Sequence, residues 1–165
     1  MNDKYQLTDE TKEVSGRRLR RIKALRDIGV YARAGHLGGW VESERNLSES
    51  GDAWVAGEAH VFADAQVFGD ALVFGSARVT GSARVSGNAR VGDSAWVSDE
   101  ARVADDALVS GKARVSGFAR IEDCAWFGDH AWIAGKVRVS GYARIGGHKR
   151  LDGGEWVSGE AKMWS

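Results

Sequence analysis

The sequence predicts an all-β protein whose chain winds into a solenoid of short parallel strands. A six-residue repeat starts at Gly51 and continues through nineteen blocks to Trp164. The third position of the block is Ala in sixteen blocks, and the fifth position is apolar in all nineteen. The stretch GSARVTGSARVSGNARV, residues 75–91, shows the repeat at its most regular. Self-similarity at a fixed period is typical of repeat architectures, in which each unit stacks on its neighbours.

Each block is expected to form one strand and one corner. The third and fifth positions are two residues apart, so their side chains point to one face of a strand, and the fourth and sixth positions point to the other. The first position is Gly in thirteen blocks and Asp in five, and both residue types tolerate the positive φ of a tight bend. Thirty-six of the thirty-eight inward positions are apolar, which predicts a continuous core in a coil whose turns stack about 4.8 Å apart.

The pattern Val-x-Gly-x-Ala-x is similar to the hexapeptide repeat of left-handed parallel β-helices. That resemblance implies a single-stranded, left-handed parallel β-helix in which three blocks make one triangular coil of eighteen residues. Nineteen blocks then correspond to a little over six coils.

The N-terminal segment lacks the strict repeat. We expect residues 1–37 to form a cap that covers the first coil, because an open coil would expose unpaired backbone groups, and residues 38–165 to form the solenoid. The run GRRLRRIKALRDIG, residues 16–29, fits either a helix or a strand, and periodicity does not decide between them. Its six basic residues are interpreted as a solvated face rather than a nucleic-acid site. Leu47 and Val55 are eight residues apart, which predicts a two-residue insertion near Glu49 and Ser50.

The run RIKALRDIGVYARAGHLGGWVESERNLSESGDAWV, followed by the six-residue blocks, resembles the start of the YdcK-like β-solenoid proteins. Their members occur in bacteria and are often encoded by phages or prophages. The resemblance covers essentially the whole chain and implies the fold. It implies little about activity, because the family is mostly uncharacterised.

Composition and charge narrow the function classes. Acidic and basic residues both number 23, so no global charge favours nucleic acid or an anionic membrane. No long apolar run occurs, and the start MNDKYQLTDETK lacks the order of a signal peptide. We therefore expect a cytoplasmic protein with no membrane association. A lone Cys124 excludes an internal disulfide and the usual multi-cysteine zinc site, and no cofactor or metal is expected.

Residues at the outward fourth position sort into three ladders, since positions eighteen apart should stack. The first ladder is Trp54, Leu72, Arg90, Leu108, Trp126, Arg144 and Lys162; the second is His60, Arg78, Trp96, Arg114, Trp132 and Arg150; the third is Gln66, Arg84, Arg102, Arg120, Arg138 and Trp156.

Two ladders and one group of phenylalanines are candidate interfaces. The second ladder alternates Arg and Trp, the residue types that dominate binding hot spots. The third ladder places four arginines in a row, which suits an acidic protein surface or a phosphate backbone, and equally suits a solubilising face. Phe62, Phe68 and Phe74 follow successive corners of one coil and are expected to form an apolar belt that receives the cap or a partner subunit.

Catalysis is the alternative to binding. Hexapeptide-repeat proteins include trimeric acyltransferases with a catalytic His in a cleft between subunits, and His36, His60, His130 and His148 are the histidines available. The repeat region contains no inserted loop that would build such a cleft, so no catalytic residue is assigned. Asp93, Asp99 and Asp105 are interpreted as corner residues rather than metal ligands.

The sequence therefore favours a non-catalytic β-solenoid that binds a protein partner and forms a homo-oligomer. The phage association of the family suggests a narrower hypothesis, an inhibitor of a host defence complex such as an anti-CRISPR protein. Binding to nucleic acid through the arginine row is a further alternative that we do not favour. Lys149 and Glu155, at inward positions of adjacent blocks, are interpreted as marking the last coil, where inward charge discourages end-to-end stacking.

Overall fold

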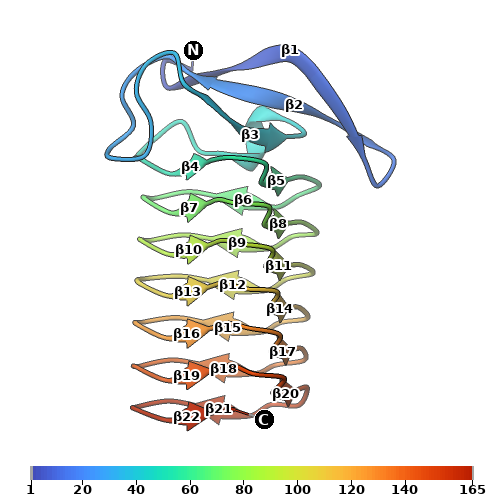
Figure 1. The fold of residues 1–165 in the computed structure, drawn as a ribbon, viewed down its shortest axis with the longest axis vertical. Coiled ribbons are helices and arrows are strands. Elements are labelled where there is room, and N and C mark those ends of the chain that lie inside the picture. Colours follow the sequence, from blue (N-terminus) through green and yellow to red (C-terminus); the bar gives the residue numbers. More distant parts are fainter. Residues whose placement is uncertain (1, 165) are drawn as a thin grey trace.

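A computed structural model describes residues 2–164, and Met1 and Ser165, the outer ends of the expected cap and solenoid, lie outside the described residues. The chain forms an all-β parallel solenoid of about seven turns, with about eighteen residues per turn (Figure 1). Within residues 2–164 no α-helix occurs, and a single 3-10 turn, η1 (Glu44–Asn46), precedes the regular coils. The all-β solenoid expected from the repeat is confirmed. The left-handed sense of the coil stays a prediction.

Each complete coil from β4 onward contributes one two-residue strand to each of three sheets, and each sheet carries one ladder. The first sheet contains β4 (Trp54–Val55), β7 (Leu72–Val73), β10 (Arg90–Val91), β13 (Leu108–Val109), β16 (Trp126–Phe127), β19 (Arg144–Ile145) and β22 (Lys162–Met163). The second contains β5 (His60–Val61), β8 (Arg78–Val79), β11 (Trp96–Val97), β14 (Arg114–Val115), β17 (Trp132–Ile133) and β20 (Arg150–Leu151). The third contains β6 (Gln66–Val67), β9 (Arg84–Val85), β12 (Arg102–Val103), β15 (Arg120–Ile121), β18 (Arg138–Val139) and β21 (Trp156–Val157).

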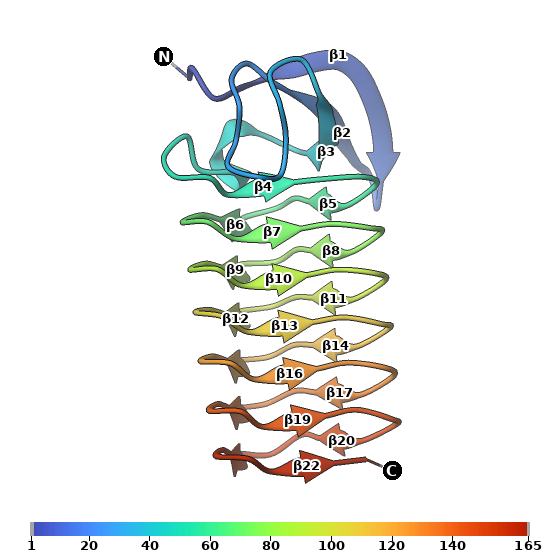
Figure 2. The ribbon, with the colours of Figure 1, turned by 60° about the vertical axis from the view of Figure 1, so that its left-hand side comes forward.

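Backbone hydrogen bonds hold the coils in this register. The N–H of Trp54, for example, donates to the carbonyl of Ala71 at 2.9 Å, and the same bond recurs from coil to coil. Strand partners stand eighteen residues apart, as in the pairs Trp96↔Arg114 and Arg102↔Arg120. Figure 2 shows the resulting straight stack. The backbone hydrogen bonds therefore fix the distance between outward side chains of neighbouring coils.

The core is a column of small and branched side chains. Inward positions from Ala53 to Ile145 are at most 1% exposed. A triangular coil leaves little interior room, so Ala and one larger apolar residue fill each wall. At the corners, Asp93 and Ala63 adopt φ values of 55° and 59°, the left-handed conformation that the first position of the block was expected to need.

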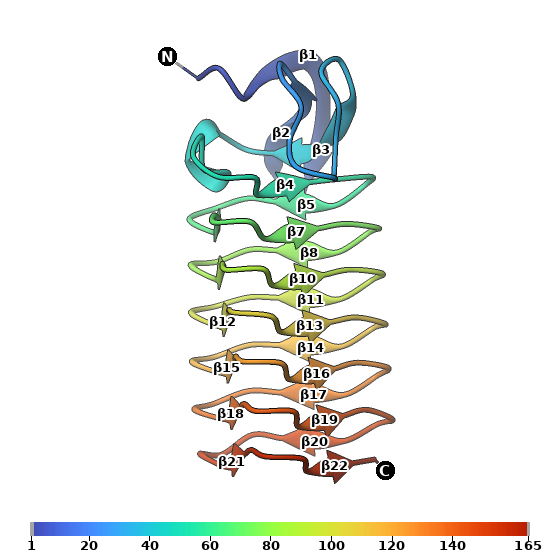
Figure 3. The same ribbon diagram turned by 90° about the vertical axis from the view of Figure 1, so that its left-hand side faces the viewer.

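The N-terminal segment extends the second sheet with antiparallel strands. Strands β1 (Tyr5–Val14) and β2 (Arg17–Ala24) form a hairpin, and β2 pairs with β3 (Leu37–Val41), which in turn pairs in parallel with β5. Figure 3 shows the hairpin and the loop after it above the first coil. Residues 17–24, for which helix and strand were both open, are thus a strand. Trp40 pairs with His60, twenty residues away, and Leu47 with Val67, also twenty away, which confirms the two-residue insertion before Val55.

Candidate binding surfaces

The second ladder stacks arginine and tryptophan side chains along one wall of the solenoid. Arg78 and Arg114 lie over the two sides of the Trp96 indole, with guanidinium carbons 6.0 and 5.7 Å from the ring centroid. Arg150 lies 3.7 Å from the centroid of Trp132. These distances fall within the range of cation–π contacts. The second ladder therefore contains two stacked groups that follow each other along the sheet, Arg78–Trp96–Arg114 and Trp132–Arg150.

The N-terminal cap covers the first residue of the second ladder. His60 is only 7% exposed, and neither of its ring nitrogens has a hydrogen-bond partner within residues 2–164. Burial, reinforced by the cations of Lys12 and Arg78, lowers the pKa of His60 to about 4, although the Glu58 carboxylate acts in the opposite direction. The accessible part of the ladder therefore begins at Arg78.

Glu58 holds the indole of Trp40, the strand partner of His60. The Trp40 indole N–H donates to Glu58 Oε2 at 3.1 Å, and Lys12 and Arg21 lie over the Trp40 ring at 5.3 and 5.5 Å. The hydrogen bond from Trp40, with the help of the two cations, lowers the pKa of the Glu58 carboxyl. Two basic residues of the N-terminal segment, Lys12 and Arg21, thus contact Trp40 and Glu58 at the start of the solenoid.

The third ladder is only partly neutralised. Arg138 forms an ion pair with Glu122 at 2.8 Å and lies over the Trp156 ring at 5.8 Å. Within residues 2–164, no ion pair or side-chain hydrogen bond involves Arg84, Arg102 or Arg120. The basic residues that form ion pairs are Lys12, Arg17, Arg18, Arg20, Arg21, Arg26, Arg138 and Arg150. Three adjacent guanidinium groups are therefore exposed and have no side-chain partner among the described residues.

The expected phenylalanine belt is divided among three environments. Phe62 is 6% exposed and packs with Leu19 of the hairpin and with Trp40, so it receives the cap. Phe74 lies so close over Gly92 that a methyl group there would collide with its ring. Phe68 is 37% exposed and packs neither against the hairpin nor over Gly92. Among the described residues, the cluster that joins the hairpin to the first coil contains Phe62 and neither Phe68 nor Phe74, and the belt stays a prediction.

Phe68 and the unpaired arginines surround one depression on the third sheet. The depression has a volume of about 200 Å³ and is lined by Phe68, Arg84, Ser86, Arg102, Ala104, Arg120, Ile121 and Glu122. The structure therefore brings together two groups of candidate residues that the sequence analysis treated separately. They converge because the sixth position of one block and the fourth positions of later blocks share the same wall.

A second hollow, not anticipated from the sequence, lies on the first sheet. Trp126 and Trp164 approach with ring centroids 6.1 Å apart and an interplanar angle of 30°, and they help to line a hollow of about 510 Å³. A Cβ atom on Gly146 would lie 2.7 Å from the Trp164 indole nitrogen. Glycine at the sixth position, where no corner requires it, was the sequence signal that could have indicated this aromatic pair.

The histidines considered for catalysis are dispersed. His36 is exposed, and its Nδ1 accepts the backbone N–H of Arg33 at 3.3 Å. His130 and His148 stack on each other with ring centroids 5.0 Å apart. Among the side chains of residues 2–164, no histidine is hydrogen bonded to a carboxylate.

The corner aspartates tie successive coils together. Asp93 Oδ2 accepts the backbone N–H of Gly111 at 2.9 Å, and Asp99 Oδ2 accepts that of Gly117 at the same distance. Asp105, Asp123 and Asp129 repeat the arrangement. No group of three or more His, Cys, Asp or Glu residues suited to a metal ion occurs within the described residues.

The C-terminal coil is less enclosed than the rest. Lys149, at an inward position, is half-buried, whereas Glu155 is exposed and accepts the backbone N–H of Gly153 at 3.0 Å. The strands β20, β21 and β22 are each the last strand of a sheet. The two inward charges therefore stand at the open end of the solenoid.

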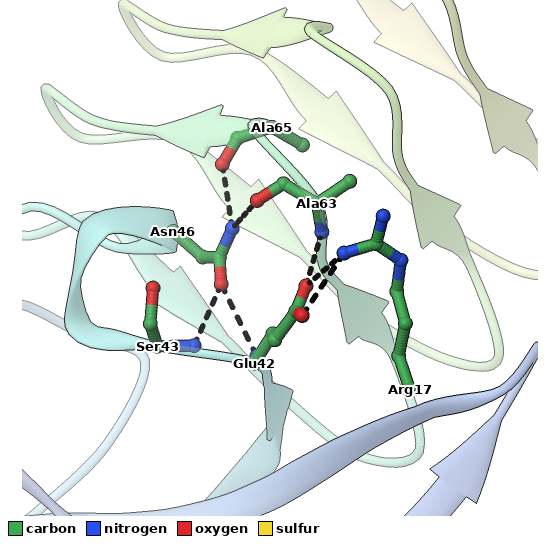
Figure 4. Close-up of polar contacts among 6 residues, drawn as sticks. All are labelled: Arg17, Glu42, Ser43, Asn46, Ala63 and Ala65. Atoms are coloured by element: carbon green, nitrogen blue, oxygen red, sulfur yellow. Dashed lines mark hydrogen bonds and ion pairs between the residues drawn. The ribbon is translucent and has the colours of Figure 1, made fainter.

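The distinctive LGGWVESERNLS segment builds the start of the solenoid. Asn46 accepts the N–H groups of Glu42 and Ser43 and donates to the carbonyls of Ala63 and Ala65, at distances of 2.9 to 3.1 Å (Figure 4). Glu42 accepts the N–H of Ala63 at 2.7 Å and pairs with Arg17 at 2.9 Å. This motif thus joins cap and first coil.

The coils themselves match a known repeat. Residues 65–82 and 83–99 each match the YdcK Beta solenoid repeat, so the similarity to YdcK-like proteins is confirmed for this repeat. No curated protein shows significant similarity to the chain. Among residues 2–164, no helix has the length and apolar composition needed to cross a membrane.

Proposed function

Since the chain carries two consecutive YdcK β-solenoid repeats, we propose that the protein is a non-catalytic interaction module that binds a protein partner through the second ladder. The residues that would contact the partner are Arg78, Trp96, Arg114, Trp132 and Arg150. The observation that carries the proposal is the stacking of Trp96 between Arg78 and Arg114.

Stacking prepares this surface for binding. Trp96 is 39% exposed although both of its neighbours in the ladder are arginines that lie over its ring. Side chains already held in place lose little conformational entropy when a partner docks. Trp and Arg are also the residue types most enriched at the energetic centre of protein interfaces. An interface is therefore the role that best uses this arrangement.

The composition of the ladder favours a partner with carboxylates beside apolar groups. A guanidinium that stacks on an indole keeps its N–H donors at the ring edge, where they can pair with a carboxylate. The narrower hypothesis, an inhibitor that occupies the surface of a host defence complex, stays a prediction about the identity of that partner.

Affinity capture from a bacterial lysate tests the proposal. Wild-type protein is compared with a Trp96→Ala, Trp132→Ala double variant and with Trp156→Ala as the matched control, since Trp156 is 69% exposed on the third sheet. We expect wild type and control to retain one protein that the double variant loses. With that protein purified, the double substitution should weaken binding by at least about 30-fold, the cost of one hot-spot residue.

Light scattering on the same three proteins tests the alternative, in which the second ladder is a contact between copies of this chain. If the double variant changes from oligomer to monomer and no partner is retained by any protein, the second ladder is a contact between copies of this chain. Equal retention of the partner by wild type and double variant would contradict binding through this face.

A further inference from the structure

We propose that the depression on the third sheet is a binding site for a phosphorylated aromatic group. The ring would lie against Phe68, and the phosphate would contact the guanidinium groups of Arg84, Arg102 and Arg120. This site lies on a different sheet from the second ladder and does not depend on the function proposed above.

The three arginines form a cationic cluster with no counter-charge of its own. Glu122, the one carboxylate in the depression, is already paired with Arg138 at 2.8 Å. Arg84, Arg102 and Arg120 occupy directly paired strand positions, about 4.8 Å apart. Like charges directly opposite each other destabilise a sheet. An anion bound between them removes this repulsion.

The fold does not require arginine at these positions. Gln66 occupies the same position at the start of the third sheet, and Leu72 and Leu108 occupy it on the first sheet. The cationic row is therefore a property of this surface and not of the repeat. A guanidinium group is planar and binds phosphate oxygens through paired N–H donors. The backbone register holds three such groups beside one hollow.

Phe68 and two small residues supply space for a ring. Phe68 is 37% exposed and forms one wall of the depression, while Ser86 and Ala104 line it between Phe68 and Glu122. Larger side chains at these two positions would fill the hollow. A phosphorylated ring placed here would contact the Phe68 ring at one end and guanidinium groups along one side.

The size of the depression restricts the ligand. Its volume of about 200 Å³ is below the range of about 300–1,000 Å³ typical of sites for whole small molecules. A single phosphorylated phenol matches this space better than a nucleotide, whose sugar and base would extend over the wall. The phosphate carries a charge of about −1.5 to −2 at neutral pH, which suits three cations.

Calorimetric titration with phenyl phosphate and with inorganic phosphate tests the proposal. We expect phenyl phosphate to bind at least about tenfold more tightly, because only it uses Phe68. Phe68→Ala should remove that difference, and Arg102→Ala should weaken phenyl phosphate binding at least about tenfold. Arg102→Lys keeps the charge and loses the paired donors, so it should also weaken binding if the geometry matters.

Arg90→Ala is the matched control. Arg90 stands at the same position of the repeat on the first sheet and has no ion pair among the described residues. The proposal is overturned if Arg90→Ala weakens binding as much as Arg102→Ala, or if phenyl phosphate binds no more tightly than inorganic phosphate. Circular dichroism of every variant verifies that the solenoid is intact.

Two further probes test whether the phosphorylated ring belongs to a polypeptide or to a free small molecule, and whether the site binds a nucleic-acid backbone instead. An acetylated Gly-Gly-phosphotyrosine-Gly-Gly peptide that binds more tightly than phenyl phosphate indicates a modified polypeptide, and a peptide that binds equally or more weakly indicates a free aryl phosphate. A single-stranded oligonucleotide that binds more tightly than both, with an affinity that Phe68→Ala leaves unchanged, would contradict the proposal, since the row of arginines would then bind a backbone without the ring pocket.

Discussion

The guanidinium carbon of Arg150 lies 3.7 Å from the ring centroid of Trp132, the closest cation–π contact among the described residues. Arg150 also pairs with Asp152 at 3.5 Å, but both of these side chains are largely exposed, and exposed ion pairs contribute little. Stacking is therefore the main contribution of Arg150 to the last coils.

Replacing Arg150 by Ala should lower the free energy of unfolding by about 1 kcal/mol through loss of this contact. Urea unfolding followed by tryptophan fluorescence measures the change. Arg90→Ala, which removes an arginine without an aromatic contact among residues 2–164, should alter stability by less than about 0.5 kcal/mol. Equal effects of the two substitutions would argue against a stabilising stack.

Tyr5→Phe should destabilise the cap. The Tyr5 side chain is 1% exposed, and its hydroxyl donates to the carbonyl of Leu47 at 2.7 Å, with the carbonyl of Glu44 at 3.1 Å. Removing the hydroxyl leaves a buried carbonyl without this donor, at a cost of about 1–2 kcal/mol. Tyr142→Phe is the control, because Tyr142 is 67% exposed. Thermal unfolding should show a lower Tm for the first variant only.

Asn46→Ala should be more damaging, because one side chain makes four hydrogen bonds at the junction of cap and solenoid. We expect a loss of about 3 kcal/mol, since two carbonyls and two N–H groups lose their partner together. Hydrogen exchange should locate the loss at residues 42–47 and 63–65. Asn88→Ala, which removes a single exposed bond to Asp106, should leave exchange there unchanged.

The buried His60 should make the cap sensitive to acid. Its folded-state pKa of about 4 lies below the ordinary value of 6.5, so between these pH values the unfolded chain binds the proton and the folded chain does not. Stability contributed by the neutral ring is therefore complete above pH 6.5 and decreases as pH falls towards 4, by at most about 3 kcal/mol.

Unfolding measured between pH 7 and pH 5, above the range in which most carboxylates titrate, isolates this effect. Lys12 and Arg78 face the ring and oppose its protonation, while Glu58 favours it. His60→Leu introduces the residue found at the same position in Leu72 and Leu108 and should flatten the pH dependence. His148→Leu, on an exposed histidine, should preserve the slope. A slope that survives His60→Leu would assign the acid sensitivity to another group.

The regular part of the fold could be predicted because the residue types within each six-residue block specify its strand and its corner. Gly or Asp at the first position permits the bend, and Ala and Val at the third and fifth positions suit the narrow interior. The eighteen-residue register followed from the resemblance to hexapeptide repeats. This register predicts that Trp96 lies beside Arg78 and Arg114, and the strand pairing confirms it. Local signals of this kind repeat every six residues, so an error in one block is corrected by the others.

The secondary structure of the N-terminal segment could not be predicted in this way. Leu19 and Ile22 are buried in a strand, yet their spacing also fits one face of a helix. The segment is a strand because β1 pairs with one of its edges and β3 with the other. Long-range pairing thus overrides an ambiguous local pattern.

The amino-acid sequence by itself determined the strand-and-corner unit, the composition of the core and the three outward ladders. Tertiary structure alone decided which outward residues became accessible sites. Phe62, Phe68 and Phe74 occupy equivalent positions of their blocks, but one lies under the hairpin, one borders three unpaired arginines and one covers a glycine. Their fates differ because the neighbours of an outward side chain come from other coils and from the cap, at sequence distances that no single block specifies.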